Sequence, residues 1–396
     1  MSAPAPLPAT PASVARFAVV SLAYFAFAGL FGTYAPLWYQ SLGYTTLAIG
    51  TLTSLQSATR LFAPYAWGSW ADHTGRREAL LRLAVGGALA SSLGFFVAPG
   101  FAWIATVCTV LYLCTAGVVP ISEAALAHRM TLGGRFDMGR YGRVRLWGSL
   151  GFIGAVTASG FILQAAGVER FPLLCTGLLA FLLFAVARLP GTTEAGSVDA
   201  PARGALAVLR EPVVAWFFTG TFLTVLAHTS LYAFFSLYLA SIGYGQGAIG
   251  LFWAVGVVAE VGWFLFQGRW LPRLSMHGWL GVAALVSALR FALIAAFAGE
   301  IAVLVVAQVL HAVTFAAQHS ACIAVITRHF PGRLRGRGQA LYTILGYGAS
   351  GVIGGVAGGA LSQSFGFAAV FWAASAVSVA AAYSCRRALV LERAAA

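Results

Sequence analysis

The sequence predicts an all-α integral membrane protein with twelve transmembrane helices, arranged as two parallel six-helix halves. Of its 396 residues 60% are hydrophobic and only 9% are charged, and a compact soluble body cannot hide so much apolar surface from water. The apolar residues fall into runs of about 20 residues or more, which is the length that crosses the hydrocarbon core of a bilayer. In addition, the second half of the chain repeats parts of the first at a constant offset.

Each predicted helix is an apolar run that ends at a turn or at charged residues. Several runs exceed the minimum length, which indicates tilted helices or ends that project from the bilayer. The predicted spans are residues 16–40, 46–71, 79–98, 101–129, 142–166, 170–189, 212–240, 246–271, 277–298, 301–327, 338–363 and 366–387. They divide the chain into a disordered N-terminal tail (1–15), two halves (16–189 and 212–388), a cytoplasmic linker (190–211) and a C-terminal tail (389–396).

The basic residues are arginines strung between the apolar runs, and they set the predicted orientation. By the positive-inside rule, the side that carries most of them is the cytoplasm, so both termini are predicted to be cytoplasmic. An even number of spans agrees with this, because it requires both termini to lie on the same side of the membrane. Of the 24 basic residues, those on this side are Arg16, Arg76, Arg77, Arg82, Arg129, Arg135, Arg140, Arg143, Arg188, Arg203, Arg210, Arg269, Arg273, Arg328, Arg333, Arg335, Arg337, Arg386, Arg387 and Arg393.

Other classes of protein are disfavoured by the same composition. The net charge of +13 is spread between apolar runs and orients the chain in a membrane, so it does not indicate a nucleic-acid partner. The five cysteines have no paired spacing, so neither a disulfide framework nor a metal site is implied. The chain shows no catalytic or nucleotide-binding motif, and we expect neither an enzyme nor a bound cofactor.

The repeat relates the two halves at an offset of 200 residues. Residues at corresponding positions after the first span of each half are identical, so six spans match six spans in parallel. The repeated residues are Ser41, Gly43, Tyr44, Ala48, Ile49, Gly50, Gly68 and Trp70, which recur as Ser241, Gly243, Tyr244, Ala248, Ile249, Gly250, Gly268 and Trp270.

Charged or titratable residues within the predicted spans are the candidate functional residues. A single charge at mid-bilayer costs about 3 kcal/mol even on the lenient insertion scale, so such residues need a partner or water. They can be structural ion pairs that hold helices together, or a substrate or proton site, and we favour the second interpretation for the group. For Arg60, gating is as good an interpretation as binding. The residues are Arg60, Glu123, Arg145, Glu260, Arg290 and His311.

The stretch YGRVRLWGSLGF, from Tyr141 to Phe152, places Arg145 at the start of a span. It resembles the start of the fifth helix in lactose-permease-like members of the major facilitator superfamily. It is similar also to their 3-phenylpropionic-acid-transporter-like relatives. The resemblance implies the superfamily's plan of two parallel halves with a substrate site at their interface.

The resemblance also assigns roles to the charged residues. It implies that Glu123 of a Glu-Ala pair works with Arg145, and that Glu260, Arg290 and the His of Leu310-His311 complete a polar cluster. In the family's sugar permease a proton-carrying Glu stands three residues after this His, where the present chain has Thr314, which cannot titrate. Glu260, Glu123 and His311, whose reference pKa is about 6.5, remain the candidates for proton coupling.

The segment from Gly68 to Arg77 joins the second and third spans. It resembles the superfamily's loop signature and is predicted to act in gating. Gly68 would permit close helix approach, and Gly75 would take the positive φ of a tight turn. Asp72 would cap a helix or meet an arginine, with Arg76 and Arg77 as the basic pair. In the second half Pro272 replaces the Asp.

Taken together, the residues favour a secondary-active transporter of the bacterial cytoplasmic (inner) membrane. The resemblance implies a small organic substrate, here an aromatic or other carboxylic acid taken up with a proton. Arg145 and Arg290 would pair with the carboxylate, and Phe152, which stands where the sugar permease has Trp, would form an apolar wall with Trp253 and Trp263. We expect a monomer in the lipid bilayer. The alternatives are an oligosaccharide or nucleoside proton symporter, a membrane sensor that does not transport, and a membrane-embedded enzyme.

Three further expectations concern buried contacts. Gln308 lies one turn from His311 and could share its network. His228 and His319 are expected to be core histidines with satisfied hydrogen bonds. Gly351, Gly355 and Gly359, at four-residue spacing, are expected to allow close helix packing.

The predicted orientation can be tested with reporter fusions. A fusion after Arg393 is expected to report the cytoplasm, because the arginines lie on that side of the membrane. A fusion after Arg170, in a loop assigned to the opposite side, serves as the matched control and should report the periplasm. An external C-terminus would contradict the topology.

Overall fold

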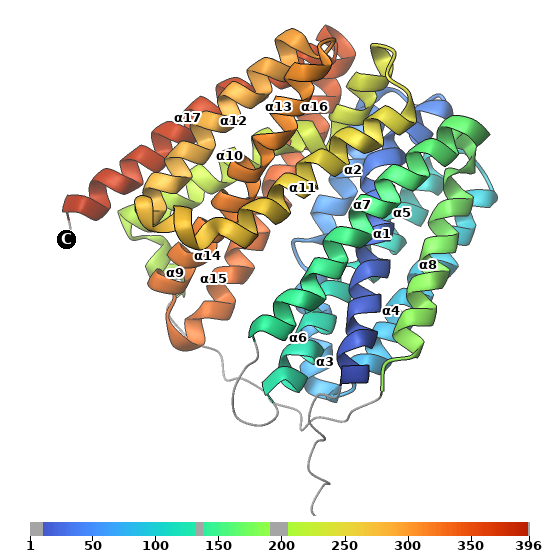
Figure 1. Ribbon diagram of the computed structural model, residues 1–396, viewed down its shortest axis with the longest axis horizontal. Coiled ribbons are helices and arrows are strands. Elements are labelled where there is room, and N and C mark those ends of the chain that lie inside the picture. Colours follow the sequence, from blue (N-terminus) through green and yellow to red (C-terminus); the bar gives the residue numbers. More distant parts are fainter. Residues whose placement is uncertain (1–10, 132–137, 191–204, 395–396) are drawn as a thin grey trace, which may run out of the picture. The chain divides into compact units, whose positions relative to one another are not determined.

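The computed structural model describes residues 11–131, 138–190 and 205–394, and within these ranges the chain is helical with no β-strand (Figure 1). The 3-10 and π segments, named η, interrupt or extend the α-helices. The first part contains α1 (Pro11–Ser41), α2 (Thr46–Thr59), α3 (Ala63–Thr74), α4 (Arg77–Ser92), η1 (Leu93–Phe96), α5 (Phe101–Thr115), α6 (Val118–Thr131), α7 (Met138–Ala166), η2 (Val168–Arg170) and α8 (Phe171–Ala187). The second contains α9 (Ala205–Leu209), α10 (Pro212–Ser241), α11 (Gln246–Trp270), η3 (Leu271–Arg273), α12 (Met276–Phe297), α13 (Ile301–Val309), η4 (Ala312–Ala317), α14 (Gln318–His329), η5 (Gly332–Leu334), α15 (Arg335–Leu341), η6 (Tyr342–Ala349), α16 (Ser350–Phe365) and α17 (Phe367–Ala394).

Eleven helical segments of the described chain are long and apolar enough to cross a membrane. They are α1, α4–η1, α5–α6, α7, η2–α8, α10, α11–η3, α12, α13–η4–α14, α15–η6–α16 and α17. The helix α1 begins at Pro11, within the segment expected to be a tail, and α17 continues to Ala394, beyond the predicted end of the last span.

The predicted second span, residues 46–71, is not one continuous helix. It is interrupted at Arg60–Phe62, where α2 ends and α3 begins. Pro64 lies in the first turn of α3 and has no N–H to donate to the carbonyl of Arg60, so an unbroken helix would lose that hydrogen bond. The prediction of a single helix was wrong here because it weighed hydropathy and overlooked this proline.

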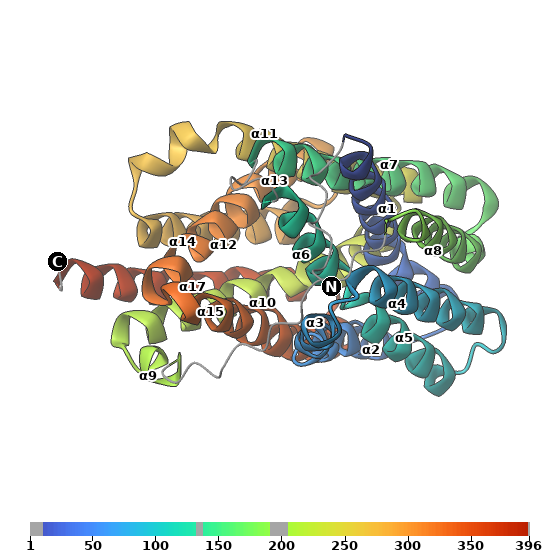
Figure 2. The same cartoon turned by 90° about the horizontal axis from the view of Figure 1, so that it is seen from below.

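The chain forms two compact units. The first contains the described parts of residues 1–31, 62–159 and 169–199, and the second contains those of 32–61, 160–168 and 200–396. In the first unit α4 packs against α5, α6 and α8. In the second unit α17 lies beside both α10 and α12, and α16 lies beside α2 (Figures 1 and 2). Helices α1 and α7 contribute residues to both units, and the six-plus-six division read from the sequence remains a prediction.

Apolar side chains are found on both the inner and the outer faces of the helices. On α12, Ala284 and Phe291 are buried, whereas Leu285 and Leu289 are 59% and 54% exposed. An exposed stripe of this kind is unfavourable in water and favourable in lipid. The helices therefore have the surface of a membrane protein.

The two copies of the sequence repeat have the same local structure. Ser41 Oγ donates to the carbonyl of Trp38 at 2.8 Å, and Ser241 Oγ donates to the carbonyl of Tyr238 at 2.7 Å. The glycines that follow have φ of 81° at Gly43 and 100° at Gly243, a region that only glycine occupies at low cost. The repeat thus encodes one helix-ending turn, used twice.

Helices α2 and α16 of the second unit pack with almost no side chain between them. A β-carbon built on Gly50 would lie 2.2 Å from the carbonyl oxygen of Gly355, and one on Gly355 would lie 2.2 Å from Ser54 Oγ. Ser54 Oγ also donates to the carbonyl of Val352 at 3.0 Å. The small-residue packing expected for Gly351, Gly355 and Gly359 is confirmed, and its partner is α2.

A methyl group at this contact should be costly. Gly50→Ala is expected to lower the free energy of unfolding by about 1–3 kcal/mol, because the backbone of Gly355 cannot move aside as a flexible side chain can. The measurement is thermal unfolding in detergent with a thiol-reactive dye, since Cys108, Cys175, Cys322 and Cys385 are buried in the folded protein.

The matched control is Gly281→Ala on α12, where a β-carbon would meet no heavy atom of the described residues within 4 Å. This variant should be neutral or more stable by up to about 1 kcal/mol through its higher helix propensity. Equal unfolding temperatures for the two variants would contradict the close packing of α2 against α16.

Candidate functional site

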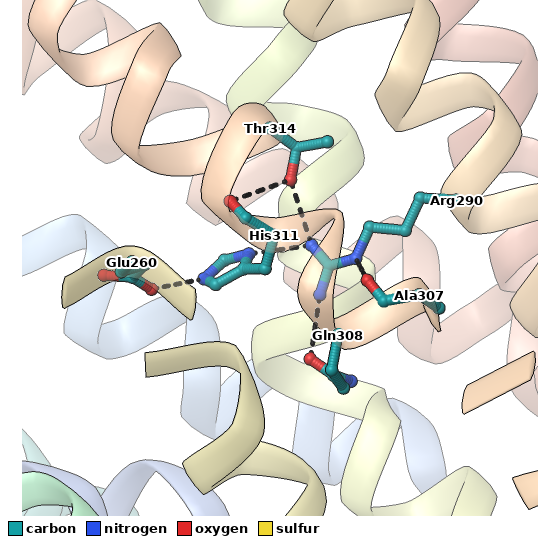
Figure 3. A network of polar contacts seen from close by, with 6 residues as sticks. All are labelled: Glu260, Arg290, Ala307, Gln308, His311 and Thr314. Carbon is teal, nitrogen blue, oxygen red and sulfur yellow. Dashed lines mark hydrogen bonds and ion pairs between the residues drawn. The ribbon is translucent and has the colours of Figure 1, made fainter. Parts of the chain in front are cut away.

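A buried polar network lies inside the second unit, formed by side chains from three helical segments (Figure 3). Glu260 comes from the middle of α11 and Arg290 from the middle of α12. The remaining groups come from the α13–η4 segment. The polar network consists of Glu260, Arg290, the carbonyl of Ala307, Gln308, His311 and Thr314.

Arg290 has no exposed surface, and four of its five N–H donors have partners in the polar network. Its Nε donates to the carbonyl of Ala307 at 2.7 Å, and its Nη2 donates to Gln308 Oε1 at 3.0 Å. Its Nη1 lies 2.8 Å from His311 Nδ1 and 3.2 Å from Thr314 Oγ1. The guanidinium is thus held in a fixed orientation inside the protein.

These contacts fix the tautomer of His311. A guanidinium only donates, so Nδ1 of His311 must be the acceptor, and the hydrogen of the neutral ring lies on Nε2. Nε2 is 2.8 Å from Glu260 Oε1, to which it therefore donates. His311 connects the positive Arg290 to the carboxyl group of Glu260 through one neutral ring.

The α13–η4 segment presents its polar groups on one face. Gln308, His311 and Thr314 are spaced by three residues, which places them one above another along a helix. The helix also changes form here. The carbonyl of Leu310 accepts from the N–H groups of both Val313 and Thr314, each at 3.1 Å, and the π-helix η4 follows directly. Such π segments are rare and are frequently found at functional sites.

A second polar site lies in the first unit, where α6 and α7 bring Glu123 and Arg145 together. Arg145 Nη1 donates to Glu123 Oε1 at 3.0 Å and to the hydroxyl of Tyr141 at 3.4 Å. These three residues line a cavity of about 40 Å³ whose walls include Tyr24 and Phe25. We call this the Arg145 cavity. It combines one cation, one carboxylate and aromatic surface.

The two arginines differ in how firmly they are held. The side chains of Arg145 and Glu123 are 55% and 39% exposed, and an ion pair with that exposure contributes only about 0–1 kcal/mol. Arg145 can therefore exchange Glu123 for another anion at small cost. Arg290, in contrast, would leave several buried acceptors unpaired if it turned away.

The residues predicted to form an apolar wall have separate surroundings. Phe152 packs against Gly29 of α1 and does not line the Arg145 cavity. Trp253 stacks on Tyr232 with ring centroids 6.3 Å apart. Trp263 meets Trp279 edge to face at 5.3 Å.

The loop predicted to act in gating is only partly as expected. Gly75 has φ of 63° and ends α3, as predicted. Asp72 pairs with Arg77 across 3.0 Å and does not cap α4, whose N-cap position is Arg76. The close approach expected at Gly68 is not found, because a β-carbon there would meet no heavy atom of the described residues within 4 Å.

Sequence reasoning missed part of both sites. Thr314 was noted only as a residue that cannot titrate, yet it binds Arg290. Tyr141 was not identified as a partner of Arg145, although the i, i+4 spacing on one helix was a usable signal. The prediction that Gln308 belongs to the polar network is confirmed.

Arg60 forms the C-cap of α2 at the helix break. Of the predicted cytoplasmic arginines, Arg135 and Arg203 lie outside the described residues.

No group of three or more metal-ligating side chains occurs within the described residues.

Comparisons with known proteins agree on one class. A model of the MFS_1 like family matches residues 14–373. A probable 3-phenylpropionic acid transporter of Escherichia coli (strain K12) is 28% identical over 369 residues, which cover 92% of this chain and 96% of that protein. A maltose permease of Geobacillus stearothermophilus is 28% identical over 361 residues, which cover 88% of each chain. The crystal structure of the nucleoside transporter NupG has a TM-score of 0.84 over 95% of this chain and 99% of its own, at 15% identity, and this likeness shows the fold.

Loss of Arg290 should destabilise the protein strongly. Arg290→Gln removes the positive charge that balances Glu260 and leaves buried acceptors unpaired, so we expect a loss of about 3–5 kcal/mol in the free energy of unfolding. Dye-monitored unfolding in detergent provides the measurement.

The double variant Arg290→Gln with Glu260→Gln removes both charges and serves as the control. It should lose less stability than Arg290→Gln alone, because no uncompensated charge remains. If the two losses simply add, Glu260 and Arg290 are not energetically coupled through His311.

Proposed function

Because the chain belongs to the MFS_1 like family and is a membrane transporter, not an enzyme, we propose that it is a secondary-active symporter that carries a small carboxylic acid together with a proton. We place it in the bacterial cytoplasmic membrane as a monomer with both termini in the cytoplasm, as the arginine distribution favours. Within this proposal the two polar sites have different tasks. The Arg145 cavity binds the acid, and the polar network around Arg290 handles the proton.

The observation that carries the acid proposal is the state of Arg145. It is a partly exposed guanidinium at a cavity, held by an ion pair of low strength. A guanidinium fork matches a carboxylate in a bidentate manner, and the aromatic rings of Tyr24 and Phe25 could cover the apolar part of an aromatic acid. The E. coli relative named a probable 3-phenylpropionic acid transporter supports the same class of solute.

The structure changes the role that we assign to Arg290. The sequence suggested that Arg145 and Arg290 both bind the carboxylate. Since Arg290 is fully buried and its donors have partners, we now propose that it positions His311 and balances the charge of Glu260. Phe152 likewise becomes a packing residue against Gly29.

The proton proposal follows from the tautomer of His311. While Arg290 donates to Nδ1, the ring cannot bind a second proton at that nitrogen, so His311 remains neutral. Glu260 is then the group of the polar network that can gain and lose a proton, and His311 holds its carboxyl group in place. Glu123, the other predicted carboxylate, is proposed to be the resting partner of Arg145.

The loop that contains Asp72 and Arg77 is proposed to act in gating. Their ion pair closes the turn between α3 and α4, and breaking it would release the start of α4. The second-half copy has Pro272 in place of the Asp and uses a different contact, the guanidinium of Arg273 at 4.4 Å from the ring centroid of Trp270.

An oligosaccharide or nucleoside proton symporter is the alternative function. Its support is the maltose permease among the relatives and the hydrogen-bonding groups Gln308 and Thr314 in the polar network, which carry no charge. An anionic solute distinguishes the two functions, because only the acid proposal requires a cation at the binding site.

Uptake by membrane vesicles tests the acid proposal. With radiolabelled 3-phenylpropionic acid as the probe, Arg145→Lys should reduce uptake at low concentration by about tenfold or more, since a point charge cannot replace a bidentate fork. Arg143→Lys, in the same motif but outside the Arg145 cavity, is the matched control and should transport normally. Normal uptake by Arg145→Lys at equal expression would refute the role of Arg145.

Glu260→Gln tests the proton proposal. Glutamine keeps the acceptor for His311 Nε2 but cannot release a proton, so accumulation driven by an imposed pH gradient should be lost. Exchange of labelled for unlabelled solute should persist, because exchange needs no net proton movement. Uphill accumulation by Glu260→Gln vesicles would exclude Glu260 as the carrier and direct attention to Glu123.

A further inference from the structure

His228 is a buried histidine with one unused nitrogen. It lies in the middle of α10 and is 4% exposed. Its Nδ1 is 2.8 Å from the carbonyl oxygen of Thr224, which only accepts, so Nδ1 carries the hydrogen. Nε2 of the neutral ring is then an acceptor, and it has no hydrogen-bond partner among the described residues. The expectation that His228 is a core histidine with satisfied hydrogen bonds was wrong.

A cavity of about 10 Å³ lies beside this histidine. His228 lines it together with Thr224, Tyr232, Thr314, Gln318 and Tyr347. That volume admits one group of the size of a water molecule or a hydroxyl. We call it the His228 cavity.

Three of the polar side chains around the cavity each direct a hydrogen elsewhere. Thr224 Oγ1 donates to the carbonyl of Gly220 at 2.8 Å, and Thr314 Oγ1 donates to the carbonyl of His311 at 3.4 Å. Gln318 Nε2 donates to Cys322 Sγ at 3.2 Å. None of the side chains that line the cavity donates to His228 Nε2, so this acceptor is open to a donor that a ligand brings.

The backbone around the cavity departs from regular α-helix in two places. Thr314 and Phe315 belong to the π-helix η4, and Tyr347 belongs to the π-helix η6. π-helical segments are rare, and they are frequently found at functional sites. Thr314 also belongs to the polar network, so the His228 cavity adjoins the groups assigned to proton handling.

We propose that His228 Nε2 accepts a hydrogen bond from a hydroxyl group of the transported solute. Tyr232, Phe315 and Tyr347 supply aromatic surface around one acceptor, an arrangement suited to a hydroxyl on an apolar ring. This inference rests on the proposed transport function and narrows it, because hydroxylated solutes are preferred over analogues that lack the hydroxyl. Without that hydroxyl, Nε2 stays unpaired in the bound state.

The test compares solutes that differ by hydroxyl groups. The probes are 3-phenylpropionic acid against its ring-hydroxylated isomers, maltose against its deoxy analogues, and uridine against dideoxyuridine. Binding to the purified full-length protein in detergent is measured as ligand-induced thermal stabilisation, titrated to give an apparent Kd. In at least one set, a hydroxylated member is expected to bind about tenfold more tightly, which corresponds to one hydrogen bond.

Two variants separate the nitrogens of His228. His228→Asn places an amide where Nδ1 was, so it can keep the bond to the Thr224 carbonyl but has no group at the position of Nε2. His228→Gln places its amide near the position of Nε2. The preference for the hydroxylated member should disappear in His228→Asn and be retained at least in part in His228→Gln.

The outcomes distinguish this proposal from the acid proposal. If the wild-type protein shows no hydroxyl preference in any set, or if the preference survives in His228→Asn, the cavity is not a solute subsite and holds a water at most. Acid binding that depends on Arg145 but not on the hydroxyl would leave the acid proposal standing alone. A preference that depends on His228 only among sugars or nucleosides would support the subsite and refute the carboxylic acid as the solute.

Discussion

A guanidinium with no exposed surface lies in the middle of a helix that crosses the membrane, and polar groups of two other helical segments are arranged around it. Lipid offers no hydrogen-bond partner, so the donors of Arg290 depend on partners within the protein, and four of the five have one. The partners come from one face of the α13–η4 segment and include a backbone carbonyl. The need to pair this one charge explains why Gln308, His311 and Thr314 share a face. It also connects the π-helix η4, which contains Thr314, to the binding of Arg290.

The same charge determines the chemistry of its neighbours. By donating to Nδ1 of His311, Arg290 keeps that ring neutral and directs its hydrogen toward Glu260. Arg145 is the opposite case. It has the same side chain, but it is half exposed at a cavity and held by one weak ion pair. A buried arginine with most of its donors paired is suited to positioning other groups, whereas an exposed one can bind a solute.

Close helix contact is the second constraint on the fold. In the α2–α16 contact the backbones approach until only glycine and serine fit between them, and such contacts drive helix association where the hydrophobic effect is absent. At the other end of α2, Pro64 interrupts the predicted span. Each feature depends on a few residues, glycines in the first case and one proline in the second. Only the glycine spacing was recognised from the sequence.

The sequence by itself determined that the protein lies in lipid, where most of its apolar spans lie, the repeated Ser-x-Gly-Tyr turns and the set of charged residues that need partners. These properties are local, since hydropathy and turn chemistry depend on residues close together in the chain. Only the tertiary structure decided which charges meet, that Arg290 is buried while Arg145 is half exposed, that Phe152 packs on Gly29, and that His228 keeps a free acceptor. Those results depend on how each helix is rotated about its own axis and on which distant helix it touches. That rotation is set by packing between residues far apart in the chain, and no single segment of the sequence contains it.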